Sequence, residues 1–513
     1  MRTARALRAV RSIRLERGGA SPMDLAYALY AGALTVLIVG IPVLRAVVLE
    51  LAEPDAAAAL LAHGPSAATA VAGLAAAALV LAGGARGPAL LSPFLTAALA
   101  GGDLPRAAVL ARPFARAVLG SAALAGLVAL LPGLGLLVAG RAEPWPVVAW
   151  TAGGALLGVV LAGCWLAGQR LTEAGRGIGA AVLLGSALIA VLRPTPVVPW
   201  SAVGTLFPGA AAGASAGAPS PGDAAVALAV LTASAVVALA VAPALLGGLR
   251  GPDLRAQAQR WQTATTLATT GDLAMATGGF RPVPRIGRGW RAVGGGSPAA
   301  LVLRRDLVGA LRTPVRAASA CLGTAAVGAL VALALDGAGS GLVMPAVAAA
   351  LVGFLALGVG ADGFRHVVDV SSAPPLYGIP TGRLLLLHGA LPAAAGVACA
   401  LAGAGIAVAG GAGATALVVA PAVVLLLVVI RAFDAAKGPL PLEVMAPVVT
   451  PAGDASALVI AAWQADALLL AGGSVLAVVS AASTVGPLGA ALVLPLGLAA
   501  AFRTRGRIAA TRA

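Results

Sequence analysis

Apolar residues occur along this chain in about twelve long runs, separated by short segments rich in Gly, Pro and Arg. Most runs have about 20 residues, the length that an α-helix needs to cross the hydrocarbon core of a bilayer. The pattern predicts an all-α integral membrane protein with about 12 transmembrane helices. A start of the eleventh run near Ala457 is an alternative, and it would place Asp466 inside the membrane. The runs cover residues 24–44, 66–84, 117–140, 146–168, 177–192, 223–249, 317–335, 341–361, 387–408, 413–432, 465–481 and 484–502.

The composition agrees with this fold class and argues against a soluble globular domain. Hydrophobic residues make up 60% of the 513 residues and charged residues only 10%, whereas a soluble domain has about 25% charged residues. All 34 basic residues except Lys437 are arginines. Together with the high Gly and Ala content, this indicates a GC-rich bacterial genome, and we expect a multi-pass protein of the bacterial plasma membrane.

The net charge of +15 is explained by orientation in the membrane rather than by a nucleic-acid partner. With the N-terminus inside, 31 of the 34 basic residues lie on the cytoplasmic side, and only Arg45, Arg141 and Arg193 lie outside. Cytoplasmic loops of membrane proteins carry such an excess of Lys and Arg. The pattern therefore predicts that both termini are cytoplasmic and that the protein has no nucleic-acid partner.

The chain divides into two related halves around a long basic loop. Residues 1–249 form a first six-span half with an N-terminal basic interfacial helix, and residues 299–513 form a second six-span half. Residues 250–298 form a cytoplasmic linker rich in Gly, Pro and Arg. In both halves a proline and a basic residue stand shortly before the third run, in "DLPRAAVLARP" and "GIPTGRLLLLHG". Duplicated halves are common among transport proteins.

Two segments are predicted to lie along the inner membrane surface, and a frayed basic tail is the alternative for the first. Arginines recur at every third position from residue 2 to residue 17, with apolar residues at the same spacing. In "AALVLRRDLVGALRTPVR" (residues 299–316), Leu301, Leu307 and Leu311 can form an apolar face. Such helices place arginines toward acidic lipid headgroups, which we expect as partners. In the second segment the charged residues are Arg304, Arg305, Asp306 and Arg312.

No motif of a catalytic or cofactor site is present in the sequence. There is no GxxxxGK[ST] phosphate loop, no HExxH and no Cys–His metal spacing. The three cysteines, Cys164, Cys321 and Cys399, fall in apolar runs without CxxC spacing, so we interpret them as small core residues. We expect no enzymatic activity, no cofactor and no metal.

Acidic residues are nearly absent from the apolar runs. An ion-coupled transporter needs an ionisable group within the membrane, and Asp466 is the one candidate. A position at the end of a helix, near the inner face, is the alternative interpretation. Trp463 and Gln464 stand beside Asp466 in the sequence, and the pattern assigns no role to any of the three.

The basic interfacial segment followed by six spans resembles the type-2 exporter class of ABC transporter permeases. "LVLRRDLVGALRTPVR" resembles the elbow helix of these permeases, and "GIPTGRLLLLHG" resembles the loop that carries their coupling helix. More specifically, the chain resembles an uncharacterised actinobacterial family of large permease-like membrane proteins. "TLATTGDLAMATGGF" and "APVVTPAGDASALVIAAWQAD" contribute to that likeness.

The resemblance implies a membrane-spanning permease subunit of an ABC-type exporter, driven by separate ABC ATPase subunits. It implies an elbow role for Arg304, Arg305, Asp306 and Arg312. It implies a docking role for Pro105, Arg106, Pro380 and Arg383. Type-2 permeases usually have one six-span unit per chain, so two fused units depart from the class. An ion-coupled secondary transporter and a non-transporting membrane scaffold are the alternatives.

Overall fold

The computed structural model divides the chain into two compact units, Met1–Thr266 (unit 1) and Leu267–Ala513 (unit 2). The boundary falls inside the range 250–298 for which the sequence predicts a linker. The structure describes residues 22–510 except 103, 194, 210–220, 270–272, 281–283, 285, 338, 372–377, 439, 442–443, 445, 447–448, 451–452 and 455. The basic interfacial helix predicted at residues 2–17 lies outside the described residues.

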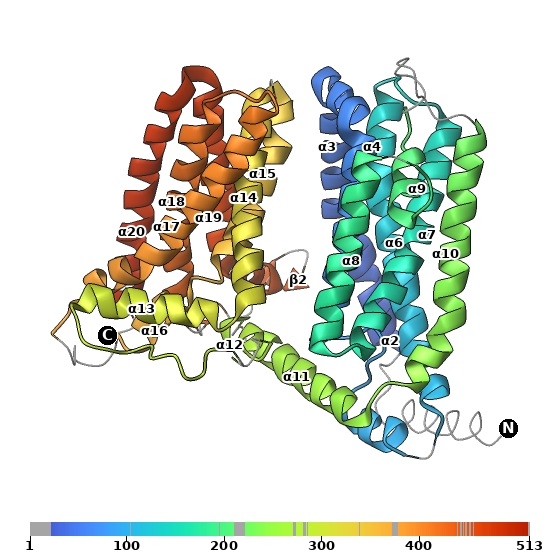
Figure 1. Ribbon diagram of the computed structural model, residues 1–513, viewed down its shortest axis with the longest axis horizontal. Coiled ribbons are helices and arrows are strands. Elements are labelled where there is room, and N and C mark those ends of the chain that lie inside the picture. Colours follow the sequence, from blue (N-terminus) through green and yellow to red (C-terminus); the bar gives the residue numbers. More distant parts are fainter. Residues whose placement is uncertain are drawn as a thin grey trace. The chain divides into compact units, whose positions relative to one another are not determined.

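Unit 1 is built from helices, and several of them begin at a proline, whose fixed φ suits the first helical position. Figure 1 shows them from blue to green along the chain. The described elements are α2 (Pro22–Thr35), η1 (Val36–Gly40), α3 (Ile41–Ala52), α4 (Pro54–Ala82), α5 (Pro93–Leu95), η2 (Thr96–Ala100), α6 (Arg106–Val138), α7 (Pro144–Arg170), α8 (Glu173–Leu192), α9 (Pro199–Thr205), α10 (Pro221–Gly247) and α11 (Gly251–Thr269).

Unit 2 is also helical, apart from one short antiparallel strand pair. Its elements are α12 (Leu273–Gly278), α13 (Pro298–Leu311), α14 (Pro314–Asp336), η3 (Gly339–Leu342), α15 (Val343–Leu357), α16 (Asp362–Asp369), α17 (Thr381–Ala409), α18 (Ala416–Ala435), β1 (Val449–Thr450), β2 (Gly453–Asp454), α19 (Ser456–Val485), η5 (Gly486–Leu492) and α20 (Val493–Ala510). Val449 pairs with Asp454 in the strand ladder. Helix α13 runs across the ends of the long helices of unit 2 (Figure 1).

The long helices confirm the predicted class, a helical multi-pass membrane protein. Within the described residues, ten helices are long and apolar enough to cross a membrane, or eleven if α15 and α16, bent by 62° at their junction, are one span. One of the ten, Leu458–Ala510, has 53 residues, which would be about 80 Å long if straight. It folds back instead, since Asp466 and Arg507, near its two ends, form an ion pair. Helices α19 and α20 are therefore separate elements joined by η5.

The two units share one internal packing order. We number the span helices from one to six along each unit. In both units the first span helix packs on the third, and the second packs on the fourth and the fifth. The fourth span helix also packs on the third and on the sixth. In unit 1 these pairs are α3–α6, α4–α7, α4–α8, α6–α7 and α7–α10, and in unit 2 they are α14–α17, α15–α18, α15–α19, α17–α18 and α18–α20.

The fourth span helix lies at the centre of both units. In unit 1, Trp150 of α7 packs edge-on against Phe207 at 5.1 Å between ring centroids and donates its indole N–H to the Ala129 carbonyl. In unit 2, α18 is the most deeply buried long helix, with 61% of its apolar window buried. Its Val and Leu side chains form the core with α14, α15, α19 and α20.

The described basic residues of each unit gather at one end, which we call the basic end. In unit 1 this is the end where α6 and α8 begin. Arg141 and Arg193 lie at the other end, and Arg45 lies in the second half of the first span, on α3. In unit 2 the basic end holds α13, α16 and the starts of α14 and α17. The turns at the opposite end of unit 2, within the described residues, contain no Lys or Arg.

Helix boundaries differ from the apolar runs at both ends of the units, and the largest difference is α4, which begins at Pro54 rather than at residue 66. Helix α6 begins at Arg106 and α19 at Ser456, because polar residues extend a helix without interrupting its backbone hydrogen bonds. The start of α19 agrees with the alternative start near Ala457. Helix α11 occupies the first part of the predicted linker and packs on unit 1 through buried Leu254 and Ala258.

Candidate functional site

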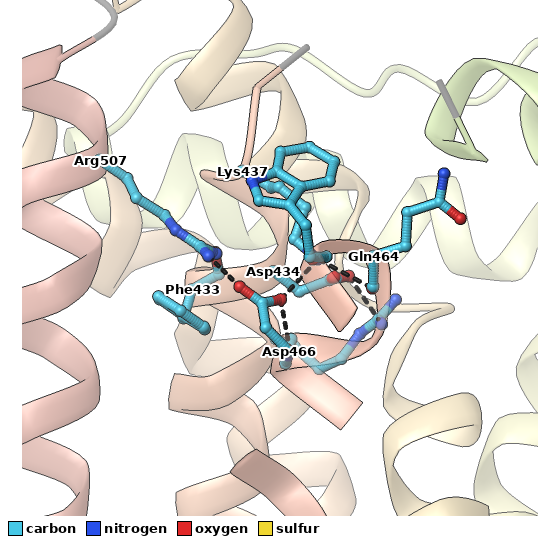
Figure 2. A network of polar contacts seen from close by, with 9 residues as sticks. Phe433, Asp434, Lys437, Gln464, Asp466 and Arg507 are labelled. Carbon is cyan, nitrogen blue, oxygen red and sulfur yellow. Dashed lines mark hydrogen bonds and ion pairs between the residues drawn. The ribbon is translucent and has the colours of Figure 1, made fainter. Parts of the chain in front are cut away.

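Ionised side chains of unit 2 meet at its basic end, where α18, α19 and α20 come together (Figure 2). Asp466 lies between two cations. Lys437 Nζ is 2.5 Å from its Oδ1 atom, and Arg507 donates to its Oδ2 atom. The peptide N–H of Ala467 also donates to Oδ1. We call Lys437, Asp466 and Arg507 the charged cluster. One carboxylate in this cluster joins the segment after α18 to both α19 and α20.

Lys437 is positioned by the end of α18, two residues before it in the sequence. Its ammonium group donates to the carbonyls of Trp463 at 2.7 Å and Gln464 at 2.9 Å. It also lies 4.9 Å from the centroid of the Trp463 ring. The carboxylate and two carbonyls use all three donors of the lysine. Its side chain is 12% exposed, so the cluster lies partly shielded from solvent.

Arg507 connects α20 to the last turns of α18. Besides Asp466, its guanidinium donates to the Phe433 carbonyl at 3.0 Å. The guanidinium carbon lies 3.6 Å from the centroid of the Phe433 ring, a cation–π geometry that is typical of arginine. The contact orients Arg507 toward the carboxylate and covers one face of it with an aromatic ring.

A second group of charges lies on the same unit around Asp362 and Asp434. Arg316 donates to Asp362 at 2.7 Å, and Arg365 is 3.6 Å from the same carboxylate. Arg431 pairs with Asp434 at 2.9 Å and lies 4.3 Å from the Phe354 ring centroid. Arg431 is only 7% exposed, so its pairing with a carboxylate offsets the cost of burying a charge.

The predicted elbow residues divide into two that pack inside unit 2 and two at its surface. Asp306 of α13 lies 2.6 Å from Nδ1 of His388 on α17. Arg312 donates to the carbonyls of Gly287 at 3.1 Å and Trp290 at 2.7 Å. Arg304 and Arg305 are exposed. Helix α13 is therefore attached to the third span helix by Asp306 and to the preceding loop by Arg312.

The predicted docking residues take equivalent places in both units. Pro105 is the N-cap residue of α6, and Pro380 is the N-cap residue of α17. Arg106 donates within unit 1, to the carbonyls of Ala100 at 3.1 Å and Leu249 at 2.8 Å. Arg383 is exposed and makes no hydrogen bond or ion pair to a described residue. Only Arg383 thus presents its guanidinium outward.

Unit 1 has an uncharged polar group at the corresponding end of its fourth span helix. Gln169 of α7 donates to Gln257 of α11 at 3.0 Å and exchanges two hydrogen bonds with the backbone of Ala89. Gln257 donates to the carbonyls of Gly83 at 3.2 Å and Gly84 at 3.3 Å. Both glutamines are buried. We call Gln169 and Gln257 the amide pair; it fastens the loop 83–92 and α11 to α7.

The edge of this loop carries an arginine stacked on an aromatic ring. The Arg86 guanidinium lies 3.7 Å from the ring centroid of Trp261. The backbone carbonyl of Arg86 accepts a hydrogen bond from the indole N–H of Trp165 at 2.7 Å. Burial lowers the pKa of the Arg86 side chain from its ordinary value. The loop 83–92 is therefore held by side chains from both α7 and α11.

Sequence patterns identified part of this arrangement. Asp466 was singled out without a role and belongs to the charged cluster, whereas Trp463 and Gln464 contribute backbone carbonyls, and the Gln464 side chain points away from Asp466 (Figure 2). Lys437 and Arg507 were not predicted. The one usable signal for Lys437 is that it is the sole lysine in a chain that otherwise uses arginine.

The contacts among these groups are ion pairs, cation–π contacts and hydrogen bonds. Within the described residues, no group of three His, Cys, Asp or Glu side chains is placed to hold a metal ion.

The comparisons with known proteins find no match: no protein-family model, no curated protein and no solved structure is similar to this chain.

Proposed function

We propose that the protein is the membrane-spanning permease subunit of an ABC-type exporter, and that a separate ATPase subunit supplies the energy. Both six-span halves come from one chain and rearrange when the ATPase closes. The chain itself does no covalent chemistry. The substrate class stays open, because no described side-chain group selects one.

The shared packing order supports an origin of the two units by duplication. Five helix pairs recur between the units, and Pro105 and Pro380 start the third span helix in each. A count of twelve spans is supported if α15 and α16 are one bent span and α19 and α20 are two. With the excess of arginine at the basic ends, the positive-inside rule supports cytoplasmic termini and a bacterial plasma membrane location.

The observation that carries the proposal is the attached elbow helix. Helix α13 precedes the first span helix of unit 2, runs across the helix ends and is joined to the third span helix by Asp306 and His388. A helix held in this way transmits movement of the basic end to the spans. Leu303, Leu307 and Leu311 are exposed along one side of α13, which suits contact with lipid, and the neighbouring Arg304 and Arg305 suit acidic headgroups.

A docking role for the loops before the third span helix is supported most clearly in unit 2. Arg383 lies in the first turn of α17, where the helix dipole disfavours a cation by about 0.3–1 kcal/mol. An anionic group on a partner or a lipid would offset this cost. The short elements α5 and η2 of unit 1 lie between the second and third span helices.

An ion-coupled transporter is supported less well. Asp466 is the one acidic residue that the sequence offered for such a role, and both of its oxygens already bind groups of the protein. A membrane scaffold remains the alternative if no ATPase associates with the chain.

The test is recovery of the tagged full-length chain in mild detergent from its native host, followed by ATPase assays in lipid nanodiscs. We expect an ATPase subunit to co-purify and the chain alone to hydrolyse no ATP, because it has no phosphate loop. ATP hydrolysis by the chain without a partner, or recovery without any ATPase in low salt, would contradict the proposal.

A further inference from the structure

Two cysteines that are 78 positions apart in the sequence, Cys321 of α14 and Cys399 of α17, meet on one helix–helix contact. The contact is close because small residues form it. A Cβ atom on Gly403 would collide with the carbonyl of Ala325, and one on Gly328 would collide with the carbonyl of Ala400. At such a crossing the two backbones touch, and side chains on the facing surfaces are brought together.

The register of the contact places the two thiols opposite each other. Gly396 faces Thr324 and Ala400 faces Gly328, so a step of four residues on one helix matches a step of four on the other, and the helices run parallel. Gly403 faces Ala325. One turn earlier on each helix, on the same face, stand Cys399 and Cys321. This register brings the side chains of Cys321 and Cys399 together on neighbouring helices, where they interact.

The surroundings of the pair determine which ligands suit it. Cys321 is exposed and Cys399 half-buried, on the apolar flank of two span helices. Apolar surroundings favour an uncharged ligand, because they solvate charge poorly. Thiol sulfur is a soft donor that prefers soft electrophiles. A suitable ligand is therefore uncharged, soft and able to bond two sulfurs at once.

We propose that Cys321 and Cys399 form a dithiol site that binds an uncharged trivalent arsenical through both sulfur atoms. For an aryl arsenoxide, R–As=O and two R′–SH give R–As(S–R′)₂ and water. Two As–S bonds form, the oxygen leaves with both thiol protons, and arsenic stays trivalent. The product is uncharged and fits the apolar flank. The site is independent of the proposed transport function.

The test uses phenylarsine oxide and the full-length protein in detergent, with Cys164→Ser as the parent so that only the pair remains. We expect one equivalent to bind, to resist a monothiol such as 2-mercaptoethanol and to be released by a dithiol such as 2,3-dimercaptopropanol. Two linked bonds typically strengthen binding about 10²-fold or more over one. Replacing either cysteine of the pair by serine should make release by the monothiol correspondingly faster.

A matched control keeps two thiols but separates them. The variant with Cys399→Ser and Leu401→Cys, in the same parent, moves the second thiol to the other side of α17. It should hold phenylarsine oxide no better than a single-cysteine variant, while eluting at the same size in detergent. Monothiol-resistant binding by this control, or binding by the parent that the monothiol removes as fast as from single-cysteine variants, would overturn the proposal.

Discussion

The basic ends of the fourth span helices offer the most instructive comparison in this molecule. Unit 1 closes the end of α7 with the amide pair Gln169 and Gln257. Unit 2 closes the end of α18 with Lys437, Asp466 and Arg507. The packing order around the two helices is shared, yet one polar group is neutral and the other contains three charges.

The difference changes what each end responds to. A hydrogen bond between amides does not vary with ionic strength, whereas ion pairs are screened by salt and attract or repel other charges. The amide pair fastens a loop of its own unit, and the charged cluster joins helix ends. We therefore expect the charged cluster of unit 2, and not the amide pair of unit 1, to respond to salt.

The largest expected effect concerns the orientation of the two units, which the comparison takes as parallel. Single cysteines at Glu143 and Leu488, in a cysteine-free background, mark the far ends of unit 1 and unit 2. Both should react with a membrane-impermeant maleimide on intact cells, and Ser297→Cys should react only after permeabilisation. Labelling of only one far-end position would mean that the units are inverted with respect to each other, and the comparison of their basic ends would fail.

Next in size is removal of the central carboxylate of the charged cluster. Asp466→Asn leaves Lys437 and Arg507 close together without an anion. Loss of one partner of a buried pair costs about 3–5 kcal/mol, and because Asp466 is 30% exposed we expect about 2–3 kcal/mol. Thermal unfolding in detergent measures the loss.

Asp336→Asn is the matched control for this substitution. Asp336 lies at the far end of unit 2 and accepts one peptide N–H, from Gly413 at 3.0 Å. Its loss should cost less than about 1 kcal/mol. Equal shifts of the melting temperature for the two variants would show that the charged cluster adds no stability of its own.

The sequence was sufficient for the long helices and insufficient for the polar contacts. An apolar run of about 20 residues reports directly on the bilayer, so each predicted run has a counterpart helix. Lys437 and Asp466 are separated by a loop and the start of α19, and their meeting depends on how α18 packs against α19. Local pattern carries no information on that contact.

The roles of individual side chains could not be predicted for the same reason, because they depend on contacts between helices. Cys321 and Cys399 show no motif spacing, since the contact between α14 and α17 alone brings them together. On α13 the sequence favoured Leu301 in the apolar face, whereas Leu303 is 44% exposed beside Leu307 and Leu311. Leu303, Leu307 and Leu311 are four residues apart and so lie on one helix face, whereas Leu301 is six residues before Leu307 and lies off that face.

A smaller effect should separate the two docking arginines, which the sequence treated as equals. Arg383→Glu should reduce recovery of the co-purified ATPase several-fold, because reversal replaces an attraction of about 0–1 kcal/mol by repulsion, and it should leave thermal stability unchanged. Arg106→Glu should lower stability as well, since Arg106 donates to Ala100 and Leu249.

Comparing the thermal stability of each variant with its recovery of the ATPase distinguishes an effect on docking from an effect on folding. Arg383→Gln, which removes the charge without reversing it, should give an intermediate recovery. If the Arg383→Glu variant recovers the ATPase as well as the parent does at low salt, the loop before α17 is not part of the docking surface.

The smallest expected effect is the change with salt in the stability of the amide-pair variants. Gln169→Leu and Gln257→Leu should each cost about 1–2 kcal/mol, because each leaves its former partners unpaired in a buried site. The double variant should cost less than the two single losses together, with an interaction energy of about 0.5–1 kcal/mol. None of these values should change between 0.1 and about 1 M NaCl, where the Debye length falls from about 10 to 3 Å, whereas the cost of Asp466→Asn should shrink. Equal salt dependence of the Gln169→Leu and Asp466→Asn losses would remove the distinction between the neutral amide pair and the charged cluster.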